Sequence, residues 1–283
     1  MVINTIGVVG AGTMGSGIAQ VAAQSGLQVT MVDVAPAALE RAHKTIASSL
    51  DRLVAKDKLD AASREQALAR IATASELAAL RTADLVIEAA TENLDIKLRI
   101  LRELDALLRP EALIASNTSS LSITVLAAVI QRPERFIGMH FFNPVPVMGL
   151  IELIRGLQTA DATHAAVEAL ARQLGKTPIS VRNAPGFVVN RILCPMINEA
   201  VFALQEGLAS AEDIDAGMRL GANHPIGPLA LADMIGLDVL LAVMDVLYEG
   251  FRDPKYRPPT LLREMVAAGL LGRKSGRGFF NYR

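Results

Sequence analysis

The sequence predicts an α/β fold with a mostly parallel sheet, followed by a separate all-α domain. Up to about residue 182, short runs rich in β-branched residues alternate with helical stretches, the pattern of parallel strands joined by crossover helices. A glycine-rich turn directly follows the first run, as in sheets that bind nucleotides. Beyond "RNAPGF", amphipathic helical segments bounded by Gly and Pro replace the β-branched runs. We therefore expect two domains, at residues 1–184 and 185–283.

The expected elements follow one another in a regular order. Between the second and third strands, the Ala- and Leu-rich residues 36–59 predict one helix that is longer than a crossover requires. In the second domain the apolar spacing predicts helices at 187–207, 211–221 and 228–249. The strands expected from β-branched runs are "TIGVVG", "QVTMVD", "ADLVIEA", "ALIAS", "RFIGMH" and "TPISVR".

One more strand, "LIELI", is expected to run against the others. The segment "FFNPVPVMG" that separates it from "RFIGMH" is too short for a helical crossover. The sheet is therefore predicted to end in an antiparallel hairpin.

Composition excludes several classes of function. Lys and Arg total 28 against 29 Asp and Glu, so there is no positive surplus for binding nucleic acid. No basic leader precedes the first strand and no apolar run is long enough to span a bilayer, so we expect a cytoplasmic protein without a membrane partner. Cys194 is the only cysteine, which excludes a disulfide within the chain, and its helical context predicts a role in the core.

The first motif, "IGVVGAGTMGSGIAQ", predicts a dinucleotide site in a Rossmann-like sheet. Gly10 permits the tight turn, Gly12 lets the backbone approach a pyrophosphate, and Gly15 lets the helix pack closely on the sheet. Thr13 and Met14 open that helix, whose amides then face the phosphates. The alternative is a glycine turn without a ligand.

Asp33 ends the second strand, about 20 residues after the glycine loop. A carboxylate at this place accepts hydrogen bonds from ribose hydroxyls and repels a 2′-phosphate. Because Val34 and Ala35 follow it, no neighbouring arginine is available for that phosphate. The sequence therefore favours NAD over NADP.

His140 lies at the carboxyl end of a strand, the edge at which open α/β sheets bind ligands. The predicted hairpin can bring Glu152 back beside it. A carboxylate bonded to one ring nitrogen fixes the tautomer and stabilises the charged ring, as a general base for an alcohol requires. The alternative is a structural histidine buried among apolar residues.

Other polar residues follow strands at the same edge. Glu88 and Glu92 flank one strand exit, where Glu92 is equally well explained as a first-turn carboxylate of the next helix. Ser122 is the expected helix cap. The polar turn after "ALIAS", which is also explained by turn chemistry, contains Asn117, Thr118, Ser119 and Ser120.

Motifs along nearly the whole chain resemble the short, single-function L-3-hydroxyacyl-CoA dehydrogenases, particularly the bacterial 3-hydroxybutyryl-CoA dehydrogenases. They are the glycine loop, "EAATEN", "SNTSSL", "GMHFFNPVPVM", "PGFVVNR", "HPIGPL" and "GRKSGRGFFNY". The resemblance implies that His140 is the catalytic base, that Glu152 orients it, and that Ser119 and Asn190 contact the substrate. The NAD-binding residues that it implies are Asp33, Glu92, Lys97, Ser119, Asn143 and Lys274. It also implies that Arg52, Lys56 and Ser119 contact coenzyme A.

Physical reasons support several of these assignments. Arg52 and Lys56 are four residues apart, hence on one helix face, where two cations can hold the phosphates of coenzyme A. The alternative is a solvated face paired with neighbouring aspartates. Asn190 opens the helical domain, and the proline after Asn143 holds that residue in an extended turn. Lys274 lies in a glycine-rich tail.

The resulting expectation is an NAD-dependent oxidoreductase acting reversibly on the 3-hydroxyl of a short L-3-hydroxyacyl-CoA, with no bound metal. The resemblance implies a homodimer formed through the helical domain. One alternative is a dehydrogenase of a free hydroxy or sugar acid such as gulonate, which assays with both substrates would distinguish. A second is a non-catalytic, crystallin-like NAD-binding protein, which would bind NADH without turnover.

Overall fold

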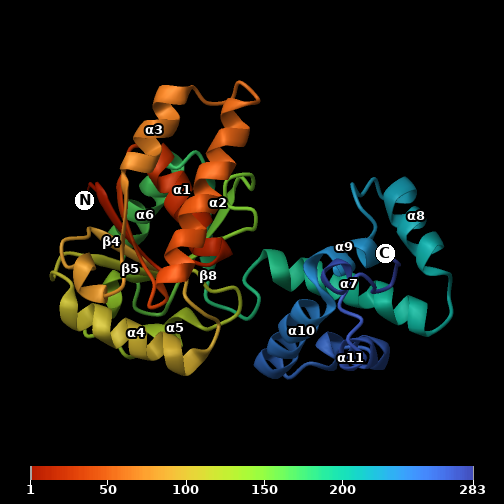
Figure 1. Ribbon diagram of the computed structural model, residues 1–283. Helices are drawn as coiled ribbons and strands as arrows, with labels where there is room; N and C mark the ends of the chain where they lie inside the picture. Colours follow the sequence, from red (N-terminus) through yellow and green to blue (C-terminus); the bar gives the residue numbers. More distant parts are fainter. Residues whose placement is uncertain (1, 283) are drawn as a thin grey trace. The chain divides into compact units, whose positions relative to one another are not determined.

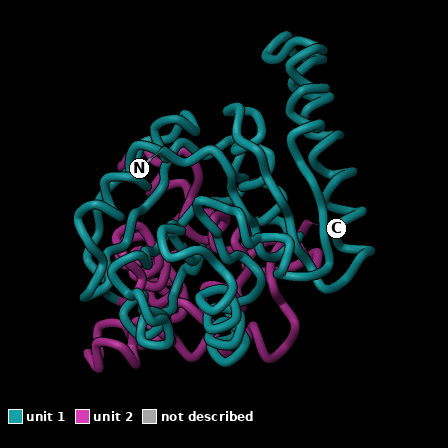
Figure 2. The backbone as a smooth tube through the Cα atoms, turned by 90° about the vertical axis from the view of Figure 1, so that its left-hand side faces the viewer, with its two compact units in different colours: residues 1–184 teal, residues 185–283 magenta. Residues whose placement is uncertain are grey.

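The computed structural model describes residues 2–282 and divides into two compact units. Unit 1 comprises residues 1–184 and unit 2 residues 185–283, shown in teal and magenta in Figure 2. Each unit contains its own hydrophobic core.

Unit 1 is built on one eight-stranded sheet with the order β3-β2-β1-β4-β5-β6-β7-β8. Neighbouring strands from β3 to β6 are parallel, β7 is antiparallel to β6, and β8 is parallel to β7. The predicted mostly parallel sheet with an antiparallel hairpin is thus confirmed, but the hairpin does not end the sheet, because the predicted strand β8 pairs with β7 beyond it. The strands are β1 (Thr5–Val9), β2 (Gln28–Val32), β3 (Ile71–Ala74), β4 (Leu85–Glu88), β5 (Leu113–Ser116), β6 (Phe136–Phe141), β7 (Leu150–Arg155) and β8 (Thr177–Arg182).

Helices cover both faces of this sheet: Figure 1 shows α1, α2 and α6 on one side and α4 and α5 on the other. Ile18 of α1 and Leu170 of α6 belong to the hydrophobic core that these helices form with the strands, and α2 packs on α1 and adds Ile46 to the same core. The helices are α1 (Thr13–Gln24), α2 (Pro36–Val54), α3 (Ala61–Ala69), α4 (Leu94–Leu107), α5 (Ile123–Ala127) and α6 (Asp161–Gln173).

Two details of unit 1 differ from the sequence prediction. The helix expected over residues 36–59 ends at Val54, because Asp57 adopts a left-handed φ of 53° and Asp60 caps a new helix by accepting a 2.7 Å hydrogen bond from the Ser63 amide. Strand β3 was not predicted, since its four residues form a half-exposed sheet edge without a long β-branched run.

Unit 2 is entirely helical apart from isolated bridges near its end, as the sequence predicted. The helix expected over residues 228–249 is two helices, because Gly236 with a φ of 103° breaks the helical backbone. Cys194 is buried in this unit's core. The helices are α7 (Val189–Gln205), α8 (Ala211–Gly221), α9 (Pro228–Ile235), α10 (Leu237–Phe251) and α11 (Thr260–Ala267), the last of which was not predicted.

Candidate active site

His140 and Glu152 face each other across the β6–β7 hairpin, in direct register. The distance between His140 Nδ1 and Glu152 Oε2 is 2.7 Å, and both residues are buried. The ring of His140 also packs against Phe142, with 4.5 Å between ring centroids. Because Nδ1 donates to the carboxylate, Nε2 is the nitrogen that can exchange a proton with a substrate. The predicted contact between these two residues is therefore present.

The glycine loop has the geometry of a dinucleotide-binding turn. Gly10 has a φ of 101°, and a Cβ atom on Gly15 would lie 1.9 Å from the Gly10 carbonyl oxygen, so the turn and α1 pack too closely for side chains. At Gly12, by contrast, a Cβ atom would meet nothing within 4 Å. Helix α1 begins at Thr13 without a side-chain cap, which leaves its first amides available to a pyrophosphate. These residues fit NAD.

The Asp33 carboxylate lies at the end of β2, beside this loop. Its Oδ2 accepts a 2.8 Å hydrogen bond from the Ala11 amide, and its Oδ1 accepts one of 2.9 Å from the Ala35 amide. The side chain is therefore held at the edge where a ribose would lie, by the same segment that forms the turn.

Glu92 connects the loops that follow β4 and β5. Its carboxylate accepts hydrogen bonds from Thr118 Oγ1 at 2.8 Å and from the Ser119 amide and hydroxyl at 2.8 and 3.1 Å. Helix α4 begins after Asn93, whose side chain is the cap, so the alternative that places Glu92 in the first turn is wrong. Ser122 caps α5, as predicted.

Lys97 is fully buried, with its Nζ 2.5 Å from Glu88 Oε2 and 3.4 Å from Ser116 Oγ. Among the implied NAD-binding residues it thus differs from Glu92 and Asn143, which are exposed. Nothing in the local sequence indicated this burial, because the partners come from β4 and β5.

A cleft of about 720 Å³ in unit 1 brings several predicted residues together. It is lined by the glycine loop with Gly12 and Thr13, by Asp33, by one face of α2 and by residues 143–147. The α2 face contributes the predicted Arg52 and Lys56, and Asn143 lies on the opposite loop.

Sequence reasoning missed two residues around this cleft. Arg41 lines it from α2, and its spacing of eleven residues from Arg52, three helical turns, could have indicated it. Lys176 donates to the carbonyl oxygens of Val145 at 2.6 Å and Met148 at 2.8 Å, so it holds the loop opposite α2. No sequence pattern indicated Lys176.

The remaining predicted residues, Asn190 and Lys274, belong to unit 2. Asn190 is the second residue of α7 and is half-buried. Lys274, in the 3-10 helix η4 (Arg273–Ser275), donates a 2.7 Å hydrogen bond to Asp238. The cleft therefore brings together six of the predicted residues of unit 1, namely Gly12, Thr13, Asp33, Arg52, Lys56 and Asn143. His140, Glu152, Ser119, Glu92 and Lys97 are not among its lining residues, and Asn190 and Lys274 belong to the helical unit.

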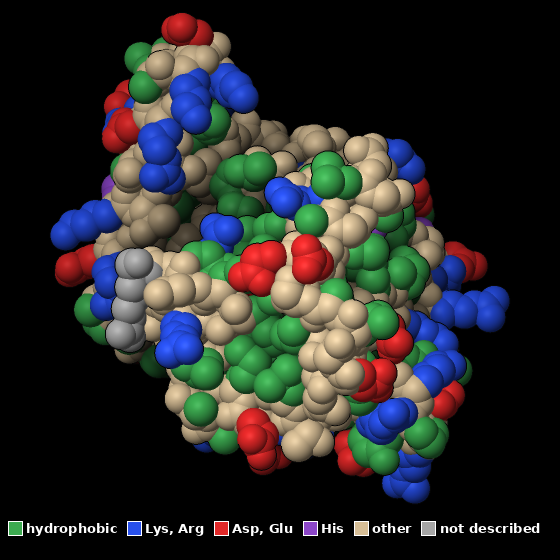
Figure 3. Space-filling model, turned by 90° about the vertical axis from the view of Figure 1, so that its right-hand side faces the viewer, with side chains coloured by type: hydrophobic (Ala, Val, Ile, Leu, Met, Phe, Trp, Pro, Cys, Tyr) green, Lys and Arg blue, Asp and Glu red, His purple; other side chains and the backbone are tan. Residues whose placement is uncertain are grey.

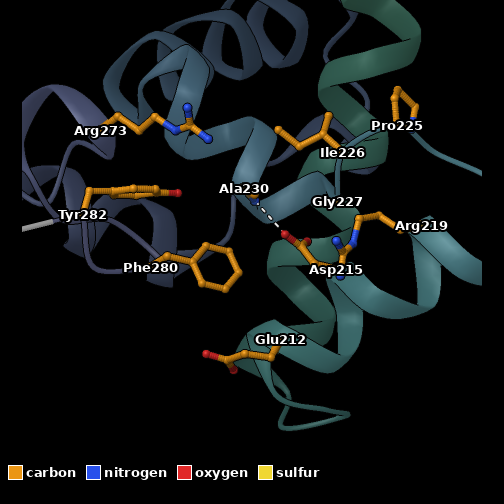
Figure 4. A pocket seen from close by; sticks show the side chains of 10 residues that line it. All are labelled: Glu212, Asp215, Arg219, Pro225, Ile226, Gly227, Ala230, Arg273, Phe280 and Tyr282. Carbon is orange, nitrogen blue, oxygen red and sulfur yellow. Dashed lines mark hydrogen bonds between the residues drawn. The ribbon is translucent and has the colours of Figure 1, made fainter.

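Unit 2 also has a pocket of its own, of about 370 Å³ (Figure 4). Its walls are held by Asp215, which accepts hydrogen bonds of 2.8 and 2.9 Å from the amides of Leu229 and Ala230. Phe280 and Tyr282 point into it from the C-terminal segment (Figure 4). None of the predicted site residues lines this pocket.

Two features are absent from residues 2–282. No group of His, Cys, Asp or Glu side chains in this range is arranged to hold a metal ion. No helix in it is both long and apolar enough to cross a membrane.

The chain matches two family models and is similar to several known proteins in sequence and in structure. The family model "3-hydroxyacyl-CoA dehydrogenase, NAD binding domain" matches residues 5–184, and "3-hydroxyacyl-CoA dehydrogenase, C-terminal domain" matches residues 186–282. A 3-hydroxybutyryl-CoA dehydrogenase of Bradyrhizobium diazoefficiens is 53% identical over 282 residues, which cover 100% of this chain and 96% of that protein. A probable 3-hydroxybutyryl-CoA dehydrogenase of Deinococcus radiodurans is 54% identical, covering 98% of this chain and 99% of that one. The crystal structure of (S)-3-hydroxybutyryl-CoA dehydrogenase from Ralstonia eutropha matches with a TM-score of 0.98 and 66% identity over 99% of both chains.

Proposed function

The chain belongs to the 3-hydroxyacyl-CoA dehydrogenase family, and from this premise we propose that it interconverts L-3-hydroxybutyryl-CoA and acetoacetyl-CoA with NAD. The observation that carries the proposal is the 2.7 Å hydrogen bond between His140 and Glu152, on the sheet that also carries the glycine loop. Oxidation of a secondary alcohol needs a base for the hydroxyl proton. When bound, NAD supplies the acceptor for the hydride that leaves C3.

His140 is the proton-transferring residue in this proposal. In the oxidative direction its Nε2 takes the hydroxyl proton, and in the reductive direction the imidazolium returns a proton to the oxygen at C3. Glu152 is fully buried, so its charge stabilises the imidazolium without competition from water. Ser119 and Asn190 hold the substrate oxygens. The position of Ser119 supports this role, because Glu92 accepts hydrogen bonds from both its amide and its hydroxyl and so holds the residue in place.

The cleft of unit 1 supports binding of both nucleotides. Asp33 and Gly12 line the part that we assign to the adenosine ribose and pyrophosphate of NAD, together with Asn143. Arg52 and Lys56 line the same cleft from α2 and are assigned to the phosphates of coenzyme A. Glu92 and Lys274 complete the set of residues proposed to contact NAD. Lys97 belongs to the same part of the site but is fully buried against Glu88, so its proposed role is indirect.

The proposed assembly is a homodimer formed through the helical unit, in the cytoplasm. Three large hydrophobic side chains of this unit, Ile192, Leu208 and Leu220, are between 68% and 85% exposed. Figure 3 shows hydrophobic side chains gathered in the middle of one face, bordered by acidic and basic ones. Exposed apolar side chains such as Ile192, Leu208 and Leu220 favour contact with a second apolar surface. A molar mass of one chain, about 30 kDa, in light scattering would contradict the dimer.

Oxidation of NADH, followed at several substrate concentrations, tests the function. We expect turnover with acetoacetyl-CoA, and comparison with longer 3-ketoacyl-CoAs gives the chain-length preference. Two controls test the alternative of a dehydrogenase that acts on free acids. They are free acetoacetate, assayed with NADH, and gulonate, assayed with NAD. Tight binding of NADH without turnover of any thioester would contradict the proposal.

A further inference from the structure

Glu88 and Lys97 form an ion pair with no solvent exposure, between the end of β4 and the first turn of α4. Ser116, at the end of β5, donates a 2.8 Å hydrogen bond to the same carboxylate oxygen, Oε2. Buried ion pairs are weak stabilisers, because desolvation offsets much of the attraction between the charges. Stabilisation of the fold therefore does not by itself account for this buried ion pair.

The second carboxylate oxygen of Glu88 holds the chain that follows β4. Oε1 accepts a 2.9 Å hydrogen bond from the Ala90 amide. The backbone of Ala89 and Ala90 in turn covers Gly10, where a Cβ atom would lie 2.6 Å from the Ala89 oxygen and the Ala90 Cα. The Glu88 side chain thus holds the segment at Ala89 and Ala90, which packs directly on Gly10, the first glycine of the cofactor loop.

The other end of this segment is anchored separately. Glu92 is bonded to Thr118 and Ser119, and Asn93 caps α4 by accepting a hydrogen bond from the Ile96 amide. Residues 89–92 are therefore held at both ends, at one end by a buried charge pair and at the other by hydrogen bonds near the surface.

We propose that Glu88 and Lys97 are positioning residues for the cofactor, holding residues 89–92 against Gly10 so that the glycine loop keeps the shape that receives a pyrophosphate. Lys97 acts through Glu88, since its ammonium group is fully buried against that carboxylate. This inference rests on the proposed function, and it assigns to the pair an effect on NADH affinity that is separate from its effect on folding.

Three variants separate positioning from stability: Glu88→Gln, Lys97→Met and the double variant Glu88→Leu with Lys97→Met. Each single change leaves one buried charge without its counter-charge, so the melting temperature should fall. The double variant removes both charges, and its melting temperature should recover. The dissociation constant for NADH, measured by fluorescence titration, should rise about tenfold in all three, because a displaced loop weakens binding. Hydrogen exchange at residues 89–93 in the free protein should be faster in all three.

Asp105→Asn is the matched control. Asp105 is also buried on α4, but near its far end, where it accepts hydrogen bonds from the Gln131 amide and from Arg132. We expect a lower melting temperature with unchanged NADH affinity and unchanged exchange at residues 89–93.

Two results would overturn the inference. The first is a double variant with wild-type NADH affinity and wild-type exchange. The second is weaker binding confined to the two variants that lack Lys97, with Glu88→Gln unaffected, which would mean that Lys97 contacts the cofactor directly. Failure of the proposed function would be recognised separately, as wild-type protein that does not oxidise NADH with acetoacetyl-CoA, whereas exchange at residues 89–93 is measured without cofactor or substrate.

Discussion

Replacement of His140 and Glu152, singly and together, tests the chemistry proposed for the hairpin. If His140 transfers the proton and Glu152 acts only through it, His140→Gln should lower kcat by about 10² to 10⁴. Glu152→Gln should lower kcat less, because the amide can still accept the hydrogen bond from Nδ1 but carries no charge to stabilise the imidazolium. The double variant should be little worse than His140→Gln alone.

The structure sets the size expected for Glu152→Gln. The Nδ1 to Oε2 distance of 2.7 Å is at the short end for a hydrogen bond to a charged group. Such bonds contribute about 1.5 to 3 kcal/mol, and the full burial of Glu152 means that water cannot replace the lost charge. Because a free-energy difference of about 1.4 kcal/mol corresponds to a tenfold change in rate, kcat should fall by about 10- to 100-fold.

The assay is NADH oxidation at saturating acetoacetyl-CoA, with the dissociation constant of NADH and the melting temperature measured for each variant. NADH affinity should stay within about twofold of wild type, because neither side chain lines the cofactor cleft. Losses that multiply in the double variant would refute the reasoning, since they would mean that the two residues act independently. Unchanged kcat in His140→Gln, with a lower melting temperature, would show a structural histidine instead.

Three further predictions concern Asp33, the α2 face and the single cysteine. The kcat/KM with NADH should exceed that with NADPH by at least about 100-fold, because a carboxylate facing a phosphate is repulsive; equal values would contradict the role of Asp33. Arg52→Ala with Lys56→Ala should raise the KM for acetoacetyl-CoA at least about tenfold, with a smaller effect on a thioester that lacks the nucleotide; equal effects on both thioesters would indicate a structural role. Burial raises the pKa of the Cys194 thiol to about 12, so it stays protonated at pH 8 and should react with a disulfide reagent only after unfolding; reaction of the native protein at the rate of a free thiol would show that it is accessible.

The parts of the site that sequence reasoning found are those in which neighbours in space are also close in the chain. The spacing of three glycines and the position of Asp33 after the second strand predict the geometry of the cofactor turn. The short connection after His140 leaves only an antiparallel return, and this places Glu152 beside it. In both cases local stereochemistry restricts the chain to very few arrangements.

The sequence by itself determined the class of the fold, the glycine loop and the His140–Glu152 pair, because strand periodicity, turn chemistry and short connections act within a few residues. Only the tertiary structure decided that Lys97 is buried against Glu88, that Lys176 holds the loop at residues 145–148, and that β3 completes the sheet edge. These arrangements join elements whose polar groups must find partners once the sheet and its helices have packed. Their partners depend on burial and on distances across the fold, which no local pattern encodes.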